Sequence, residues 1–141
     1  MNTPKTILSG ILLLLSQLSS AQKTAPPTDL PYSKKILLSE QVLESLFRLT
    51  DNVSVELGTG FHLEGKLLNK TPHGNSGVSL LIKVYSQPGG MLNITRFTDA
   101  HGKIYYTGRL LKLHEPNGMM LMEKDQHYYF IETQQRFLLS E

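Results

Sequence analysis

The chain of 141 residues contains no cysteine. Disulfides, a cysteine nucleophile and a lipid anchor attached to a cysteine are therefore excluded. Exported domains of this size often carry disulfides where their compartment supports them, so the absence favours a bacterial periplasm or cell surface over a eukaryotic secretory route. We expect burial and hydrogen bonding alone to hold the fold together.

The chain also lacks an apolar run long enough to cross a membrane as a helix, which takes about 20 residues. Its most apolar run, residues 7–15, is about half that length and follows the basic Lys5. A polar stretch with a small-x-small cleavage site comes next, which is the layout of a secretory signal peptide. The pattern predicts a signal peptide over residues 1–21, cut between Ala21 and Gln22, and a secreted or periplasmic protein. An uncleaved membrane anchor is the alternative.

An excess of charge of one sign is missing as well. Removal of Lys5 with the signal leaves 13 of the 14 basic side chains against 12 acidic ones. Nucleic-acid binding requires a clear basic patch, so this balance argues against a nucleic-acid partner. It argues equally against binding through bulk charge to anionic membranes.

No catalytic or cofactor motif stands out, and a G-x-S-x-G elbow is absent. His62 and Glu64 are two apart on a predicted strand and could form a pair of metal ligands, while Glu56 and Glu64 could form a carboxylate pair. The spacing typical of zinc sites is missing, and a solvated sheet face explains these side chains more simply. We therefore predict no enzyme, no metal and no cofactor. A third metal ligand would have to come from His101, His114 or His127.

Residues 22–34 are polar and hold three prolines, which predicts an extended linker before a single β-rich domain over residues 35–141. The one predicted helix covers residues 39–50, with Ser39 as its N-cap and an apolar stripe for packing on a sheet. Glu44 and Arg48 are spaced for an ion pair along that helix.

From Val53 onward, apolar and polar residues alternate with the period of strands that bury one face. Turn residues separate the runs at short intervals, among them TPHGNSG at 71–77. This pattern predicts a mainly β fold, a small antiparallel meander forming a barrel or sandwich, with one N-terminal helix packed on it. Gly65 and Gly108, in mid-strand, indicate a bend or a close approach. The alternating runs are 53–57, 61–67, 78–84, 92–94, 104–106, 120–122 and 128–130.

Neighbouring aromatic residues occur in two of the predicted strands. In an alternating strand one member of each pair must point away from the core, and an outward tyrosine suits a sugar, a peptide or a partner surface. Cross-strand packing is the alternative. The predicted contact residues are Tyr105, Tyr106, Arg109, Tyr128 and Tyr129.

Four stretches carry a resemblance to a known group. They are KILLSEQVLESLF (35–47), GFHLEGKLL (60–68), LIKVYSQPGGMLNITR (81–96) and DAHGKIYYTGRLL (99–111). The chain resembles a family of small secreted proteins of Bacteroidota-type bacteria that has no assigned activity. The resemblance implies an exported single-domain protein and transfers no site residue.

Together these observations predict an exported, non-enzymatic β-domain that binds or assembles with a protein or glycan partner at the envelope or outside the cell. An inhibitor or regulatory module for another exported protein is the first alternative, and an envelope hydrolase is the second.

Overall fold

A computed structural model of the chain describes residues 34–139, apart from the side chain of Phe137. The predicted signal peptide, its cleavage site at Ala21 and Gln22, and all but the last residue of the predicted linker lie outside the described residues. The described elements are β1 (Lys35–Leu38), α1 (Glu40–Leu46), β2 (Asn52–Gly58), β3 (Phe61–His73), β4 (Gly77–Val84), β5 (Gly90–Thr98), β6 (Ile104–Leu111), β7 (Asn117–Lys124), β8 (His127–Gln134) and α2 (Gln135–Leu138).

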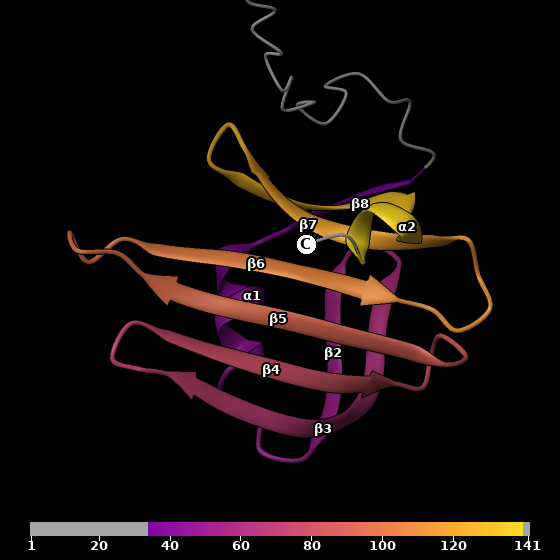
Figure 1. Cartoon of the computed structure of the whole chain (residues 1–141), viewed down its shortest axis with the longest axis horizontal. Coiled ribbons are helices and arrows are strands. Elements are labelled where there is room, and N and C mark those ends of the chain that lie inside the picture. Colours follow the sequence, from indigo (N-terminus) through magenta and orange to yellow (C-terminus); the bar gives the residue numbers. More distant parts are fainter. Residues whose placement is uncertain (1–33, 140–141) are drawn as a thin grey trace, which may run out of the picture. The chain divides into compact units, whose positions relative to one another are not determined.

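The eight strands form one antiparallel sheet in the order β1-β8-β7-β6-β5-β4-β3-β2 (Figure 1). Strands β2 to β8 follow one another as a meander, and β1 pairs with β8. The two edge strands approach each other at Gly58, where an added Cβ would lie 2.5 Å from Cγ2 of Ile36 and 2.6 Å from the carbonyl oxygen of Leu37. The sheet is therefore a nearly closed barrel, which confirms the predicted antiparallel β fold.

The barrel interior is filled by the inward members of the alternating runs. Leu63, Leu80, Ile82, Ile94 and Phe130 are 0% exposed, and each belongs to a run that the sequence pattern identified. Burial of such side chains is the main contribution to the stability of a domain without disulfides.

Helix α1 begins as predicted, because the Ser39 hydroxyl accepts the Val42 N–H at 3.2 Å. It buries Leu43 and Leu46. It ends at Leu46, four residues before the predicted end at residue 50, because the next backbone bonds run to carbonyls three residues back and tighten the last turn.

Three further predictions about the elements are wrong. Strand β1 precedes α1, so the helix is not N-terminal to the sheet, and α2 is a second helix that the pattern missed. The turn predicted over 71–77 is shorter, because β3 continues to His73 and β4 starts at Gly77.

Among the described residues, no helix is long and apolar enough to cross a membrane.

The β3 strand bends sharply as it crosses from β2 to β4 (Figure 1). A Cβ on Gly65 would lie 2.1 Å from the carbonyl oxygen of Lys83, so only glycine allows the two backbones to approach this closely. A register shift follows between Leu67 and Asn69. The interpretation of Gly65 as an architectural glycine is confirmed.

Strands β6 and β7 pair over three residues only, Gly108–Leu110 with Met119–Leu121, whereas β5 and β6 pair over eight. Beyond this short ladder the two strands diverge. Where β6 no longer pairs with β7, the Tyr106 N–H donates to the hydroxyl of Tyr128 at 3.4 Å. A side chain from β8 thus replaces the backbone acceptor that β7 would have supplied.

Candidate functional site

The five predicted contact residues are divided between the two faces of the sheet. Tyr106 and Tyr128 point into the barrel and are 6% and 2% exposed. Their neighbours Tyr105 and Tyr129 point outward and are half-buried, as is Arg109. The alternation of strand side chains imposes this division.

Tyr106 and Tyr128 are core residues, so the prediction that they lie on the contact surface is wrong for both. Their rings meet edge to face, with centroids 5.4 Å apart and planes at 87°. Burial, followed by the hydrogen bond to Glu44, raises the pKa of the Tyr106 phenol well above its usual range. Burial also raises the pKa of Tyr128, outweighing the N–H of Tyr106. Both hydroxyls therefore stay protonated at neutral pH.

A polar cluster that the sequence analysis missed joins α1 to β5 and β6. Nη1 of Arg96 donates to both carboxylate oxygens of Glu44, at 2.7 and 3.0 Å, and the Tyr106 hydroxyl donates to Oε2 at 2.9 Å. The guanidinium carbon of Arg96 also lies 5.5 Å from the centroid of the Phe47 ring. The hydrogen-bonded partner of Glu44 is thus Arg96 and not the predicted Arg48.

The charge of Glu44 is stabilised by these contacts. Burial raises the pKa of the carboxyl, but the hydrogen bonds from Arg96 and Tyr106 and the charges of Arg96 and Arg48 outweigh burial and lower the pKa below its usual value. The carboxylate accepts its hydrogen bonds from two other elements of the fold, although its side chain is 30% exposed. We infer that these contacts hold α1 in place against β5 and β6.

A row of apolar side chains lies on the outer face of β1, β8 and β7. Leu37 is paired with Tyr129, and Tyr129 with Met122, so the three lie side by side across the strands. Leu37 is 53% exposed. Nζ of Lys35 lies 3.7 Å from the centroid of the Tyr129 ring and covers part of it. We call Leu37, Tyr129 and Met122 the outer row.

Tyr105 lies elsewhere on the outer face, beside Phe97 on β5. Its hydroxyl donates to Oδ2 of Asp99 at 3.0 Å, and Lys103 lies 4.6 Å above its ring. The hydrogen bond to Asp99 raises the pKa of Tyr105, while the backbone N–H of Lys103, above all, lowers the pKa of Asp99. The polar end of Tyr105 is therefore engaged in ordering its own turn.

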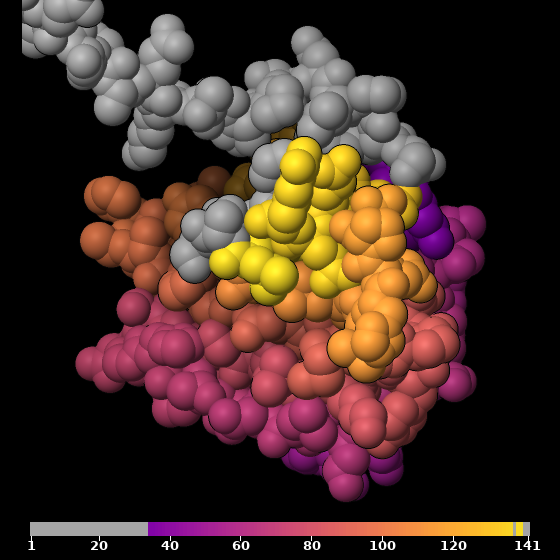
Figure 2. Space-filling view, turned by 45° about the vertical axis from the view of Figure 1, so that its right-hand side comes forward, coloured from indigo at the N-terminus to yellow at the C-terminus, as the bar shows by residue number. Residues whose placement is uncertain are grey.

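Arg109 lies in a hollow of about 320 Å³ on the outer face, which we call the outer groove. Its Nη1 donates to the carbonyl oxygen of Leu138 in α2. Figure 2 shows the C-terminal segment, in yellow, lying over the orange strands beside it. The residues that line the groove are Asn93, Thr95, Thr107, Gly108, Arg109, Met120, Leu121 and Leu138.

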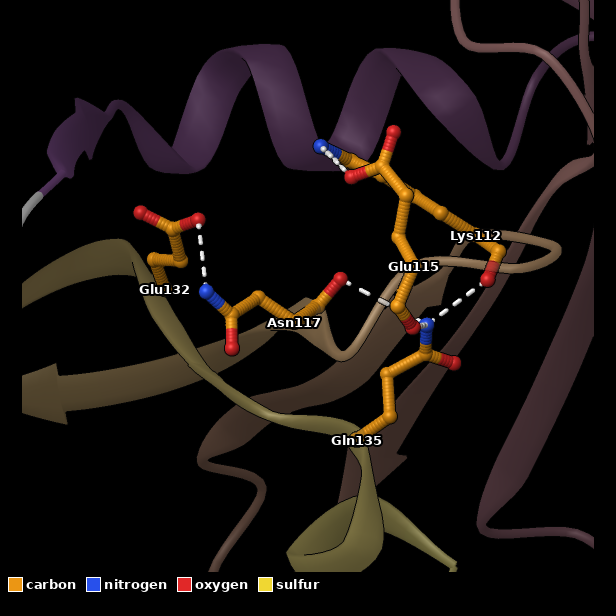
Figure 3. A network of polar contacts seen from close by, with 5 residues as sticks. All are labelled: Lys112, Glu115, Asn117, Glu132 and Gln135. Carbon is orange, nitrogen blue, oxygen red and sulfur yellow. Dashed lines mark hydrogen bonds and ion pairs between the residues drawn. The ribbon is translucent and has the colours of Figure 1, made fainter.

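Gln135 holds α2 in place, the helix whose Leu138 lines the outer groove (Figure 3). Its Nε2 donates to the carbonyl oxygens of Lys112, at 2.6 Å, and of Glu115, and lies 3.5 Å from that of Asn117. An amide nitrogen has two hydrogens, so the longest contact is the weakest. The backbone N–H of Gln135 donates to the carbonyl oxygen of Pro116 at 2.8 Å. One residue thus ties α2 to the loop between β6 and β7.

The histidines considered as metal ligands do not converge. His62 lies on the exposed face of β3, with Nδ1 3.4 Å from Glu56 and Nε2 3.5 Å from Glu64, and it bonds Ser54 at 3.2 Å. Over residues 34–139, no three or more His, Asp or Glu side chains are grouped to hold a metal ion. His62 therefore meets both carboxylates on an open sheet surface and not within a cleft.

Comparison of the chain with protein-family models, with curated proteins and with solved structures finds no match.

Arg96 could have been found from the sequence, because it continues the inward alternation of Leu92 and Ile94 and places a charge on a core face. The groove could not, because Arg109 and Leu138 meet only through the packing of α2.

Proposed function

We propose that this chain is an exported, non-enzymatic binding module that engages a protein partner through the outer row. The observation that carries the proposal is the cross-strand row of Leu37, Tyr129 and Met122 on the outer face, in which Leu37 is exposed and the other two are half-buried. Tyrosine and methionine are enriched at protein interfaces, and an aromatic residue beside aliphatic ones is the composition of an interface core.

A protein fits this row better than a glycan does. Sugar recognition uses an open aromatic face, but Lys35 lies over the ring of Tyr129 at 3.7 Å. The exposed apolar atoms come instead from Leu37, beside the half-buried Met122, and they suit apolar side chains of a protein. The lysine then supplies a polar rim, and an inhibitor or regulatory module is one form that such a binder takes.

Photo-cross-linking in the producing cell tests the proposal. A benzophenone amino acid replaces Leu37 in one variant and Lys66 in a control, because Lys66 is exposed on β3. We expect one discrete protein adduct from position 37 and none from position 66. The partner identified by mass spectrometry should then bind the purified Leu37→Glu protein at least about 10-fold more weakly than the wild type.

Several outcomes would reject the outer row as the interface. These are equal adducts at both positions, a glycan adduct without protein, or unchanged affinity of Leu37→Glu. Circular dichroism of each variant checks that the barrel is intact, so a lost interaction is not confused with unfolding.

A further inference from the structure

Arg109 is a half-buried cation without a carboxylate partner among the described residues. The ion pairs of residues 34–139 involve other side chains, and the bond of Arg109 to Leu138 uses one of its five N–H donors. A charge withdrawn from water without a counter-ion is unfavourable. The remaining donors therefore favour an anion at this position.

The outer groove has the size and lining of a small-ligand site. Its volume of about 320 Å³ lies at the lower end of the range for such sites. Asn93 and Thr107 supply polar atoms around Arg109, while Met120 and Leu138 supply an apolar wall. A ligand that matches this lining carries a carboxylate at one end and a short apolar body at the other.

The groove is also formed before any ligand arrives. Its floor lies where β6 still pairs with β7, since Arg109 faces Met120 in the three-residue ladder. The Thr95 hydroxyl is fixed by a 2.7 Å hydrogen bond to Ser79, and Gln135 fixes the helix that forms the wall. A preformed site loses little conformational freedom on binding.

We propose that the outer groove binds a small organic acid, whose carboxylate pairs with Arg109 and whose apolar body lies against Met120 and Leu138. The proposal is independent of the outer row, which lies on other residues. The second source of a carboxylate is the side chain of Glu141, which lies outside the described residues, and the experiment separates these two sources.

The test is an NMR titration of the purified protein with hexanoate, and with hexanol and inorganic phosphate as matched probes. Hexanol lacks the carboxylate and phosphate lacks the apolar body. We expect hexanoate to shift the methyl signals of Met120 and Leu138 in a saturable manner, and to bind at least about 10-fold more tightly than either control probe. Equal binding of hexanol and hexanoate, or no saturable shift at these methyl groups, would overturn the proposal.

Two variants address the role of Arg109. Arg109→Gln should weaken hexanoate at least about 10-fold, and Thr107→Asp should do the same because it places a fixed carboxylate beside Arg109 while keeping the arginine. Thr107 is exposed, so this second variant preserves the packing of α2. Arg48→Gln, beside α1, is the control and should leave the affinity within about twofold. Unchanged binding in Arg109→Gln and Thr107→Asp would contradict the assignment.

Glu141→Gln distinguishes the two sources of the carboxylate. If a free acid is the ligand, this variant binds hexanoate within about twofold of the wild type. If the Glu141 side chain occupies the groove, Glu141→Gln shifts the Met120 and Leu138 methyl signals by itself and binds hexanoate markedly more tightly than the wild type. That result would replace the organic acid with the chain's own side chain.

Discussion

Glu44 connects three elements through one carboxylate, because Arg96 comes from β5 and Tyr106 from β6. Replacing Glu44 by Gln keeps the shape but removes the charge. We expect Glu44→Gln to lower the free energy of unfolding by about 1–2 kcal/mol, measured by urea denaturation. Glu40→Gln, on the exposed first turn of the same helix, is the control and should change stability by less than about 0.5 kcal/mol.

The same residue makes stability depend on pH in a defined direction. The folded-state pKa of Glu44 lies below the usual 4.5, so its contribution is present above that pH and is lost as pH falls through the folded value. The stability difference between the wild type and Glu44→Gln should therefore shrink as the pH is lowered from 7 to 3. A difference that stays constant over this range would show that the charge is not the origin of the effect.

At Gly65 the backbone of the neighbouring strand β4 leaves no space for a side chain. A methyl group there would lie 2.1 Å from a backbone oxygen of β4, which cannot move away as a flexible side chain would. Gly65→Ala should cost at least about 2–3 kcal/mol, seen as a lower thermal midpoint. The adjacent exposed Lys66→Ala serves as the comparison, and similar midpoints for both variants would refute the steric account.

At the scale of single residues, the sequence predicted much of the barrel interior. The reason is that period-two alternation is a local property, which tertiary packing leaves unchanged. It placed Leu63, Ile82 and Phe130 on buried faces, as found. The same alternation put Tyr128 on the buried face with Phe130, as found, but the predicted contact surface still included Tyr128 as well as its outward neighbour Tyr129.

At the scale of elements, α2 depends on tertiary contacts more than on its own sequence. It is four residues long, too short to be stable alone, and Gln135 at its start bonds the loop between β6 and β7. No pattern in QRFL could predict it. The same reason explains β1, whose four residues form a strand only because β8 lies beside them.

Gln135→Leu keeps the side-chain bulk and removes the amide. We expect faster amide hydrogen exchange over residues 112–117 and 135–138, with little change in β3 and β4, because only the link between α2 and the loop is cut. The control is Gln134→Leu, at the exposed neighbouring position. Uniformly faster exchange throughout the barrel would mean that Gln135 supports the whole fold and not this link alone.

At the scale of the whole molecule, the predicted signal peptide can be tested directly. The protein recovered from the exported fraction should begin at Gln22, with an intact mass lower by that of residues 1–21. Ala21→Leu fills the small-residue position and should slow the cut, whereas Gln22→Asn, just after it, should not. A full-length product outside the cytoplasm would instead favour the membrane-anchor alternative.

The meander itself was predictable because each hairpin joins neighbours in sequence, and short turn signals mark every step. The sequence pattern left a barrel and a sandwich open, because the choice rests on the return of β1 to β8 and on the contact of Gly58 with Leu37. Neither contact leaves a mark in local composition.

The pairing of β1 with β8 has a consequence for how the molecule is made. A chain that emerges from its N-terminal end presents Lys35 early, but its partner Ile131 emerges only after the strands β2 to β7. The hairpins between them can assemble one after another as they appear, while β1 and the helix that follows it wait. The final strand therefore sets the moment of completion, and a chain stalled before it would expose the open interior to chaperones and proteases.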